Sequence, residues 1–337
     1  MDSHRFDYDL PPDRIAQVAI EPRDASRLLI ARDLTEIPFR QLPDLLDPGD
    51  LIVVNTTRVR RARLVGTRVD TGGTVEILVT RRIDDHRWEG LARPARRLRA
   101  GVTIALAGRT CTLLTDPRDG IVTMAFDPGA GVEEAIEVHG QLPLPPYFNG
   151  ELADDDRYQT MFASRVGSAA APTAALHFTD AVVAACEAGG VRFASVELEV
   201  GLDTFRPMAS DDLDQHEIHT EAVHVGEDAV AAIAAARGRG GRVIAVGTTV
   251  IRALETAAVA DGRIEPFHGA TDLFITPGHR FSVIDGAITN FHAPRTTLIV
   301  LVAALIGDRW REVYDHAISA DFRFLSFGDA MYIEVRR

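Results

Sequence analysis

Lysine is missing from this chain of 337 residues, so all 36 of its lysine-plus-arginine positions are arginine. The absence excludes a lysine Schiff base and a lysine general base. Every permanent side-chain cation is instead a planar guanidinium, which suits phosphate and carboxylate groups. A compositional bias toward arginine explains the absence more simply than selection for function, so this feature alone assigns no activity.

Cysteine is scarce and long hydrophobic runs are absent. Cys111 and Cys186 form no metal or redox motif, and no apolar run reaches the length of a membrane span. The first ten residues, MDSHRFDYDL, are acidic rather than signal-like. We therefore expect a cytoplasmic protein with two inert thiols and no membrane partner.

The net charge of −13 argues against a protein that coats nucleic acid without specificity. Two arginine clusters, at 58–63 and 93–99, could still form a local RNA contact. Each cluster taken alone is more typical of a solvated face.

The pattern of strand-like and helix-like segments changes twice along the chain, which predicts two domains. Residues 61–146 hold short β-rich runs separated by glycine and aspartate turns, which is typical of a small barrel or sandwich. The flanking segments alternate strand-like and helix-like patterns, typical of an α/β fold. We predict a discontinuous α/β catalytic domain, 1–60 and 147–337, that carries an inserted small β-barrel domain, 61–146.

Two segments near the C-terminus predict a polar ligand site. Val243–Val246 is a buried-strand pattern that opens through Gly247-Thr248-Thr249 into a helix with Arg252. This arrangement brings N–H groups, hydroxyls and a cation to one edge of a sheet, where open α/β folds bind ligands. The second segment places Asn290, His292 and Arg295 within six residues, between two apolar runs. Polar groups that dense need a ligand or each other.

The histidines are less decisive. His177 follows a small-residue segment, and a capping or core role is as compatible with its position as a site role. His216 and His219 form a His-x-x-His pair without a third ligand, so we expect no metal. Together with Glu221 they lie in an acidic segment that we expect to be an exposed loop.

Several motifs occur together and in order along nearly the whole chain. They are Arg23-Asp24-Ala25-Ser26-Arg27-Leu28, Asn55-x-Thr57-Arg58-Val59, Ala171-Pro172-Thr173-Ala174-x-Leu176-His177-Phe178-Thr179, Val246-Gly247-Thr248-Thr249 and Thr289-Asn290-Phe291-His292-x-Pro294. In this order they resemble the S-adenosylmethionine:tRNA ribosyltransferase-isomerase family of queuosine biosynthesis. The resemblance implies an α/β domain with an inserted barrel, which agrees with the pattern above.

The resemblance also implies a reaction. The ribosyl part of S-adenosylmethionine moves to the aminomethyl group of a 7-deazaguanine base in the tRNA anticodon stem-loop and isomerises to an epoxycyclopentane. Adenine and methionine leave, and S-adenosylmethionine is a co-substrate, with no metal or other cofactor.

On this basis we expect His177, His292 and Asn290 to be catalytic, with a histidine as proton donor to the departing adenine. The residues expected to bind substrate are Asn55, Thr57, Arg58, Pro172, Thr173, Thr179, Thr204, Arg206, His219, Glu221, Gly247, Thr248, Thr249, Arg252 and Arg295.

Four positions depart from the family pattern. Thr56, Glu199, Asp203 and Ala222 stand where the family usually has Asp, His, Gly and Tyr. These exchanges alter charge and hydrogen-bonding capacity in segments expected to form the site. They leave open a diverged paralogue that uses S-adenosylmethionine with a non-tRNA small-molecule acceptor. A binding protein without catalytic activity is a third alternative.

Overall fold

In a computed structural model of the chain, all residues are described except 128–130, 150, 151, 153, 202–207, 209, 217, 219, 260, 261, 336 and 337. The chain divides into two compact units. One contains Met1–Arg58 and Pro145–Arg337, and the other contains Val59–Leu144. The predicted fold class, an α/β domain with an inserted β-barrel, is confirmed. No helix in the described part of the chain is long and apolar enough to span a membrane.

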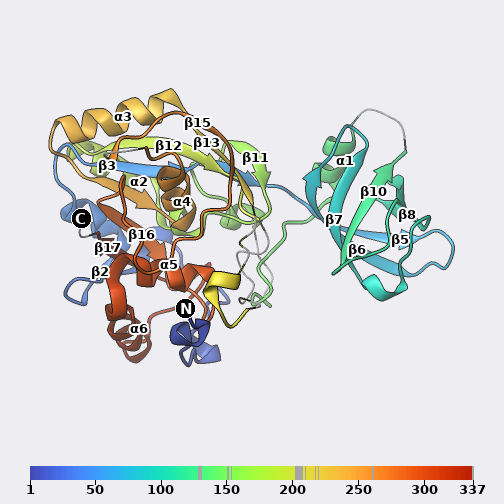
Figure 1. The fold of residues 1–337 in the computed structure, drawn as a ribbon, viewed down its shortest axis with the longest axis horizontal. Helices are drawn as coiled ribbons and strands as arrows, with labels where there is room; N and C mark the ends of the chain where they lie inside the picture. The colour runs from blue at the N-terminus through green and yellow to red at the C-terminus, as the bar shows by residue number, and fades with distance from the viewer. Residues whose placement is uncertain are drawn as a thin grey trace. The chain divides into compact units, whose positions relative to one another are not determined.

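The first unit is built on a nine-stranded sheet of order β15-β13-β12-β3-β14-β16-β17-β1-β2 (Figure 1). In chain order, its strands are β1 (Arg27–Ile30), β2 (Thr35–Pro38), β3 (Leu51–Asn55), β12 (Arg192–Leu198), β13 (Glu221–Val225), β14 (Val243–Val246), β15 (Phe267–Thr271), β16 (Gly286–Asn290) and β17 (Ala330–Glu334). A separate pair is formed by β4 (Thr57–Val59) and β11 (Arg165–Ser168).

Hydrophobic side chains of the central strands alternate between the two faces of the sheet. In β3, Leu51 and Val53 join one core, while Ile52 and Val54 join the other. The first core is completed by α3 (Glu227–Gly238), α4 (Thr248–Thr256), α5 (Thr297–Ile306) and α6 (Trp310–Ser319). The second is completed by α2 (Asp180–Ala188) and the 3₁₀ helices η4 (Phe39–Leu45) and η7 (Thr173–His177). Burial on both faces explains why these strands are continuous apolar runs.

Strand direction determines where the polar segments meet. β12, β3, β14 and β16 are mutually parallel, so their carboxyl ends share one edge of the sheet. β17 is antiparallel to β16 and parallel to β1, so the segments that precede β17 and β1 come to the same edge. This edge therefore collects loops from six parts of the sequence.

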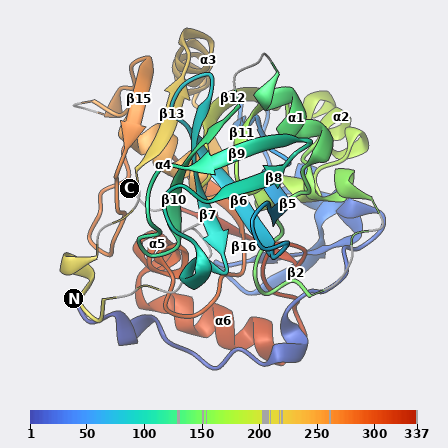
Figure 2. The ribbon, with the colours of Figure 1, turned by 90° about the vertical axis from the view of Figure 1, so that its right-hand side faces the viewer.

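The second unit is a closed barrel of order β10-β7-β6-β5-β8-β9. Its strands are β5 (Arg63–Arg68), β6 (Thr74–Arg82), β7 (Arg87–Arg93), β8 (Thr103–Leu106), β9 (Arg109–Leu113) and β10 (Ile121–Phe126). Figure 2 shows them with α1 (Val132–His139), which adds Val132 and Ile136 to the barrel core. Closure leaves the barrel sheet without free edges.

Several element boundaries differ from the sequence pattern. The helix expected from residue 250 begins at Thr248, directly after the strand. α1, the edge strand β15 and its neighbour β13 were not anticipated. The expectation that Glu221 lies in an exposed loop is wrong, because it begins β13 and is only 7% exposed.

Candidate active site

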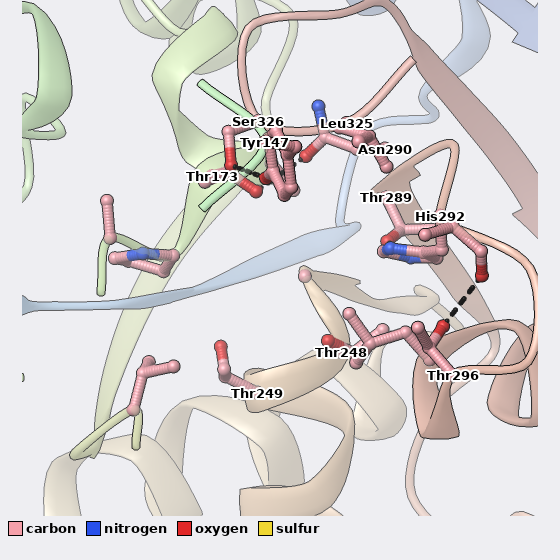
Figure 3. Close-up of a pocket in the computed structure, with 17 residues that line it drawn as sticks. Tyr147, Thr173, Thr248, Thr249, Thr289, Asn290, His292, Thr296, Leu325 and Ser326 are labelled. Carbon is pink, nitrogen blue, oxygen red and sulfur yellow. Dashed lines mark hydrogen bonds between the residues drawn. The ribbon is translucent and has the colours of Figure 1, made fainter. Parts of the chain in front are cut away.

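A pocket opens at the edge where the parallel strands end (Figure 3). It encloses about 620 Å³, including its open mouth. The residues that line it are Tyr147, Ala171, Pro172, Thr173, Ala174, Val200, Gly247, Thr248, Thr249, Thr289, Asn290, His292, Ala293, Thr296, Leu298, Leu325 and Ser326. The walls are apolar, with a few hydroxyl, amide and imidazole groups, as is usual for small-molecule sites.

The turn between β14 and α4 forms one wall. Gly247 has φ +92° and ψ 153°, a conformation that side-chain-bearing residues rarely adopt. This conformation turns the chain sharply from the strand into the helix, so that Thr248 and Thr249 both line the pocket. No side chain caps the start of the helix at Gly247. The first N–H groups of α4 thus face a cavity suited to an anionic group.

Asn290 forms the opposite wall at the end of β16 and is 2% exposed. Its Oδ1 accepts a hydrogen bond from Thr173 Oγ1 at 2.9 Å. Its Nδ2 lies 3.4 Å from the carbonyl of Asp329 and 3.2 Å from Nε2 of His177. The carbonyl of Asp329 can only accept, so it assigns the N–H groups to this end of the amide. That assignment makes His177 Nε2 the unprotonated nitrogen.

His177 lies behind Asn290 and does not line the pocket. Its protonated Nδ1 donates to Ser26 Oγ at 2.7 Å, and its ring stacks on Phe39. Burial, reinforced by Arg323, Arg157 and Arg23, lowers the pKa of His177 to about 3. The ring is therefore neutral at pH 7, and its geometry makes it a support for Asn290.

His292 does line the pocket, and its backbone is clamped from two sides. Tyr314 Oη accepts from the His292 N–H at 3.1 Å, while Tyr8 Oη donates to the His292 carbonyl at 2.5 Å. Its Nε2 lies 2.9 Å from Thr289 Oγ1. Burial lowers the pKa of His292 to about 3. A role as proton donor to adenine therefore requires that bound substrate raise this pKa.

The two buried histidines predict how stability depends on pH. Their pKa values are about 3 in the folded protein against an ordinary 6.5, so between these values the unfolded chain binds protons that the folded chain does not. Stability is therefore complete above about pH 6.5 and falls as the pH decreases, by up to roughly 1.4 kcal/mol per pH unit for each histidine. Urea unfolding from pH 4.5 to 7 should show this slope, and H177Q should reduce it. An unchanged slope in H177Q would show that His177 is protonated when folded.

Other predicted residues support the pocket from outside. Asn55 is fully buried, and its side chain binds the carbonyl of Leu198 and the N–H of Thr57. Thr57 receives a hydrogen bond from Ser168. Thr179 caps α2 and donates to Asp24. Arg58 is exposed on β4.

The predicted arginines are engaged with carboxylates. Arg252 is buried against Glu221 and also donates to the carbonyl of Leu273 at 3.0 Å. Arg295 pairs with Asp211 at 2.7 Å. Neither arginine lines the pocket. Thr204, Arg206 and His219 lie outside the described residues.

Tyr147 and Ser326 line the pocket and were missed by the sequence reasoning. Their side-chain oxygens lie 2.5 Å apart. Tyr147 ends the proline-rich segment 142–147, and Ser326 directly precedes a further motif, Phe327-Gly328-Asp329, at the C-terminal limit of the family resemblance. The motif was the one signal that could have indicated Ser326. No group of three or more potential metal-binding side chains was found among the described residues.

Comparison with known proteins agrees with these motifs. Residues 3–333 match the family model described as queuosine biosynthesis protein. The chain belongs to this family. It is 46% identical to an S-adenosylmethionine:tRNA ribosyltransferase-isomerase from Symbiobacterium thermophilum, over 97% of this chain and 98% of the relative. It is 48% identical to a protein of the same name from Rhodospirillum rubrum, over 96% of each chain.

A solved structure gives the same result. The crystal structure of S-adenosylmethionine tRNA ribosyltransferase from Thermotoga maritima is 34% identical, with a TM-score of 0.56. The match covers 98% of this chain and 99% of that one. The family resemblance inferred from the motifs is therefore confirmed.

Proposed function

We propose that this protein transfers and isomerises the ribosyl moiety of S-adenosylmethionine onto 7-aminomethyl-7-deazaguanine in tRNA. The product is epoxyqueuosine-tRNA, and adenine and methionine are released. The observation that carries the proposal is a family match over residues 3–333, in which three of the five motifs contribute residues to one pocket. We also propose that the two compact units correspond to the predicted domains.

The geometry suggests how the pocket serves this reaction. The open start of α4 at Thr248 and Thr249 can receive the methionine carboxylate, because unpaired N–H groups and the helix dipole favour an anion there. Asn290 and Thr173 are held to each other and can bind base or ribose edges. Apolar walls such as Val200, Leu298 and Leu325 exclude water from reactive intermediates.

Three of the four departures from the family pattern do not favour the alternative acceptor. Thr56 binds the carbonyl of Val196, and Glu199 and Ala222 are exposed. None of these three lines the pocket, and Asp203 lies outside the described residues. None of the three described departures therefore changes a residue that lines the pocket.

Adenine release tests the proposal. We expect release from S-adenosylmethionine only when an anticodon stem-loop with the aminomethyl deazaguanine is present, measured by chromatography. A stem-loop with guanine at that position is the matched control, because it lacks the accepting amine. Bound S-adenosylmethionine without release on the modified RNA would contradict the proposal and favour the small-molecule acceptor.

A further inference from the structure

A second cavity adjoins the active-site pocket. It encloses about 280 Å³, and the polar side chains that line it are those of Arg23, Ser26, Arg157, His177 and Ser326. Ser326 lines both cavities, and the His177–Asn290 hydrogen bond lies between them. A group bound in the second cavity would therefore lie beside a substrate in the first.

The topology explains why Arg23 and Ser26, from the first of the matched motifs, line this cavity. Arg23-Asp24-Ala25-Ser26 directly precedes β1, and Ser326 precedes β17. Because β1 and β17 are parallel to each other and β17 is antiparallel to β16, both segments reach the edge where β16 ends. Asp24 accepts from Thr179, and Ser26 accepts from His177, so two members of the motif fix the surrounding structure.

Among the described residues, the charged side chains that line this cavity are those of Arg23 and Arg157. Arg23 donates to the carbonyls of Asp156 and Gln159, both at 2.7 Å, and Arg157 donates to the carbonyl of Ile20 at 2.8 Å. Backbone carbonyls fix a guanidinium without neutralising it. The carboxylate paired with Arg157 belongs to Glu21, which is 67% exposed, and the described residues that line the cavity include no carboxylate. Burial, and then the neighbouring Arg157, lower the pKa of Arg23, while Glu21, Asp154 and Asp156 act to raise it.

We propose that the cavity between Arg23 and Arg157 binds a phosphate of the RNA backbone next to the nucleotide being modified. The inference rests on the proposed function and names a substrate contact for it. Guanidinium groups that are already oriented suit phosphate oxygens. The methionine carboxylate is the other available oxyanion, but an ammonium group stands beside it, and the described part of the chain lines this cavity with no acidic partner for that cation.

Salt dependence of RNA binding tests the inference. We expect R23Q and R157Q each to weaken binding of the modified anticodon stem-loop about tenfold. The magnitude of the slope of log affinity against log salt concentration should fall by about 0.7–0.9, because one phosphate contact is lost. S-adenosylmethionine affinity, measured by calorimetry without RNA, should be unchanged. R32Q is the control, because Arg32 is an exposed arginine of the same unit that pairs with Glu334.

Competition by inorganic phosphate provides a second readout on the unmodified protein. At constant ionic strength, phosphate should displace the stem-loop from the wild type more effectively than chloride does. Loss of S-adenosylmethionine affinity with normal RNA binding would identify the carboxylate as occupant and overturn the inference. Normal binding of both substrates, with no phosphate competition, would also overturn it. Either result could occur while the wild type still releases adenine, so the proposed function would stand separately.

Discussion

Replacing Asn290 with aspartate is expected to lower kcat for adenine release about 100-fold, with the fold retained. The change removes the N–H donors that face His177 Nε2 and the carbonyl of Asp329, and it places a carboxylate in the pocket wall. Without these two hydrogen bonds the pocket wall shifts, and misplacing a group that positions substrate by about 1 Å costs on the order of 10²-fold in rate. Single-turnover adenine release with saturating RNA and S-adenosylmethionine measures the effect.

The chain offers a matched control for this variant. It contains three asparagines, and Asn149 is an exposed one whose amide lies 3.4 Å from the carbonyl of Tyr147. N149D should retain wild-type kcat within about twofold. If N290D also retained it, Asn290 would be a structural residue and the catalytic assignment would fail.

Replacing Asp50 with alanine is expected to lower the free energy of unfolding by about 3–5 kcal/mol. The side chain of Asp50 is 1% exposed and accepts from the N–H of Arg242, the Arg242 guanidinium and the N–H of Asp47. Burial acts to raise the pKa of Asp50, but these hydrogen bonds outweigh it and hold the pKa below its usual value. The variant removes the buried acceptor of two N–H groups at the start of β3 and β14, and it leaves Arg242 with only Asp47 and the carbonyl of Leu45 as close acceptors.

Urea unfolding at pH 7 measures this loss, and D70A is the control, because Asp70 pairs with Arg68 at an exposed position. The depressed pKa also fixes the sign of the pH dependence. The contribution of Asp50 is complete above the ordinary value of 3.8 and disappears as the pH falls through the lower folded value. If D50A unfolded at the wild-type urea concentration, the pair would be no determinant of stability.

Local patterns were sufficient to predict the framework. Leu51–Val54 and Val243–Val246 are continuous apolar runs, and both are central strands buried on two faces. The change to short β-rich runs after residue 60 indicated the inserted barrel, because alternation and turn residues are local properties. Helix α1 was missed because it has only eight residues and follows a long β-rich segment. A periodic pattern over so few residues is hard to distinguish from that of a strand or loop.

Pairing between distant residues was not predictable in the same way. Glu221 and Arg252 were each expected to bind substrate, yet they bind each other across β13 and α4. Tyr147 and Ser326 are 179 positions apart and come together in the pocket. His177 had two equally compatible roles, and its place behind Asn290 became clear from the fold.

The sequence by itself determined the family, the fold class and the segments that form the site, because ordered motifs and periodic patterns are properties of the chain. The tertiary structure alone decided which polar groups face the pocket and which satisfy one another. Strand direction determined which groups meet. Because β17 is antiparallel to β16 and parallel to β1, the segments with Ser326 and Arg23 reach the edge where β16 presents Asn290. A buried polar group must find a partner, and only the folded chain shows whether that partner is protein or ligand.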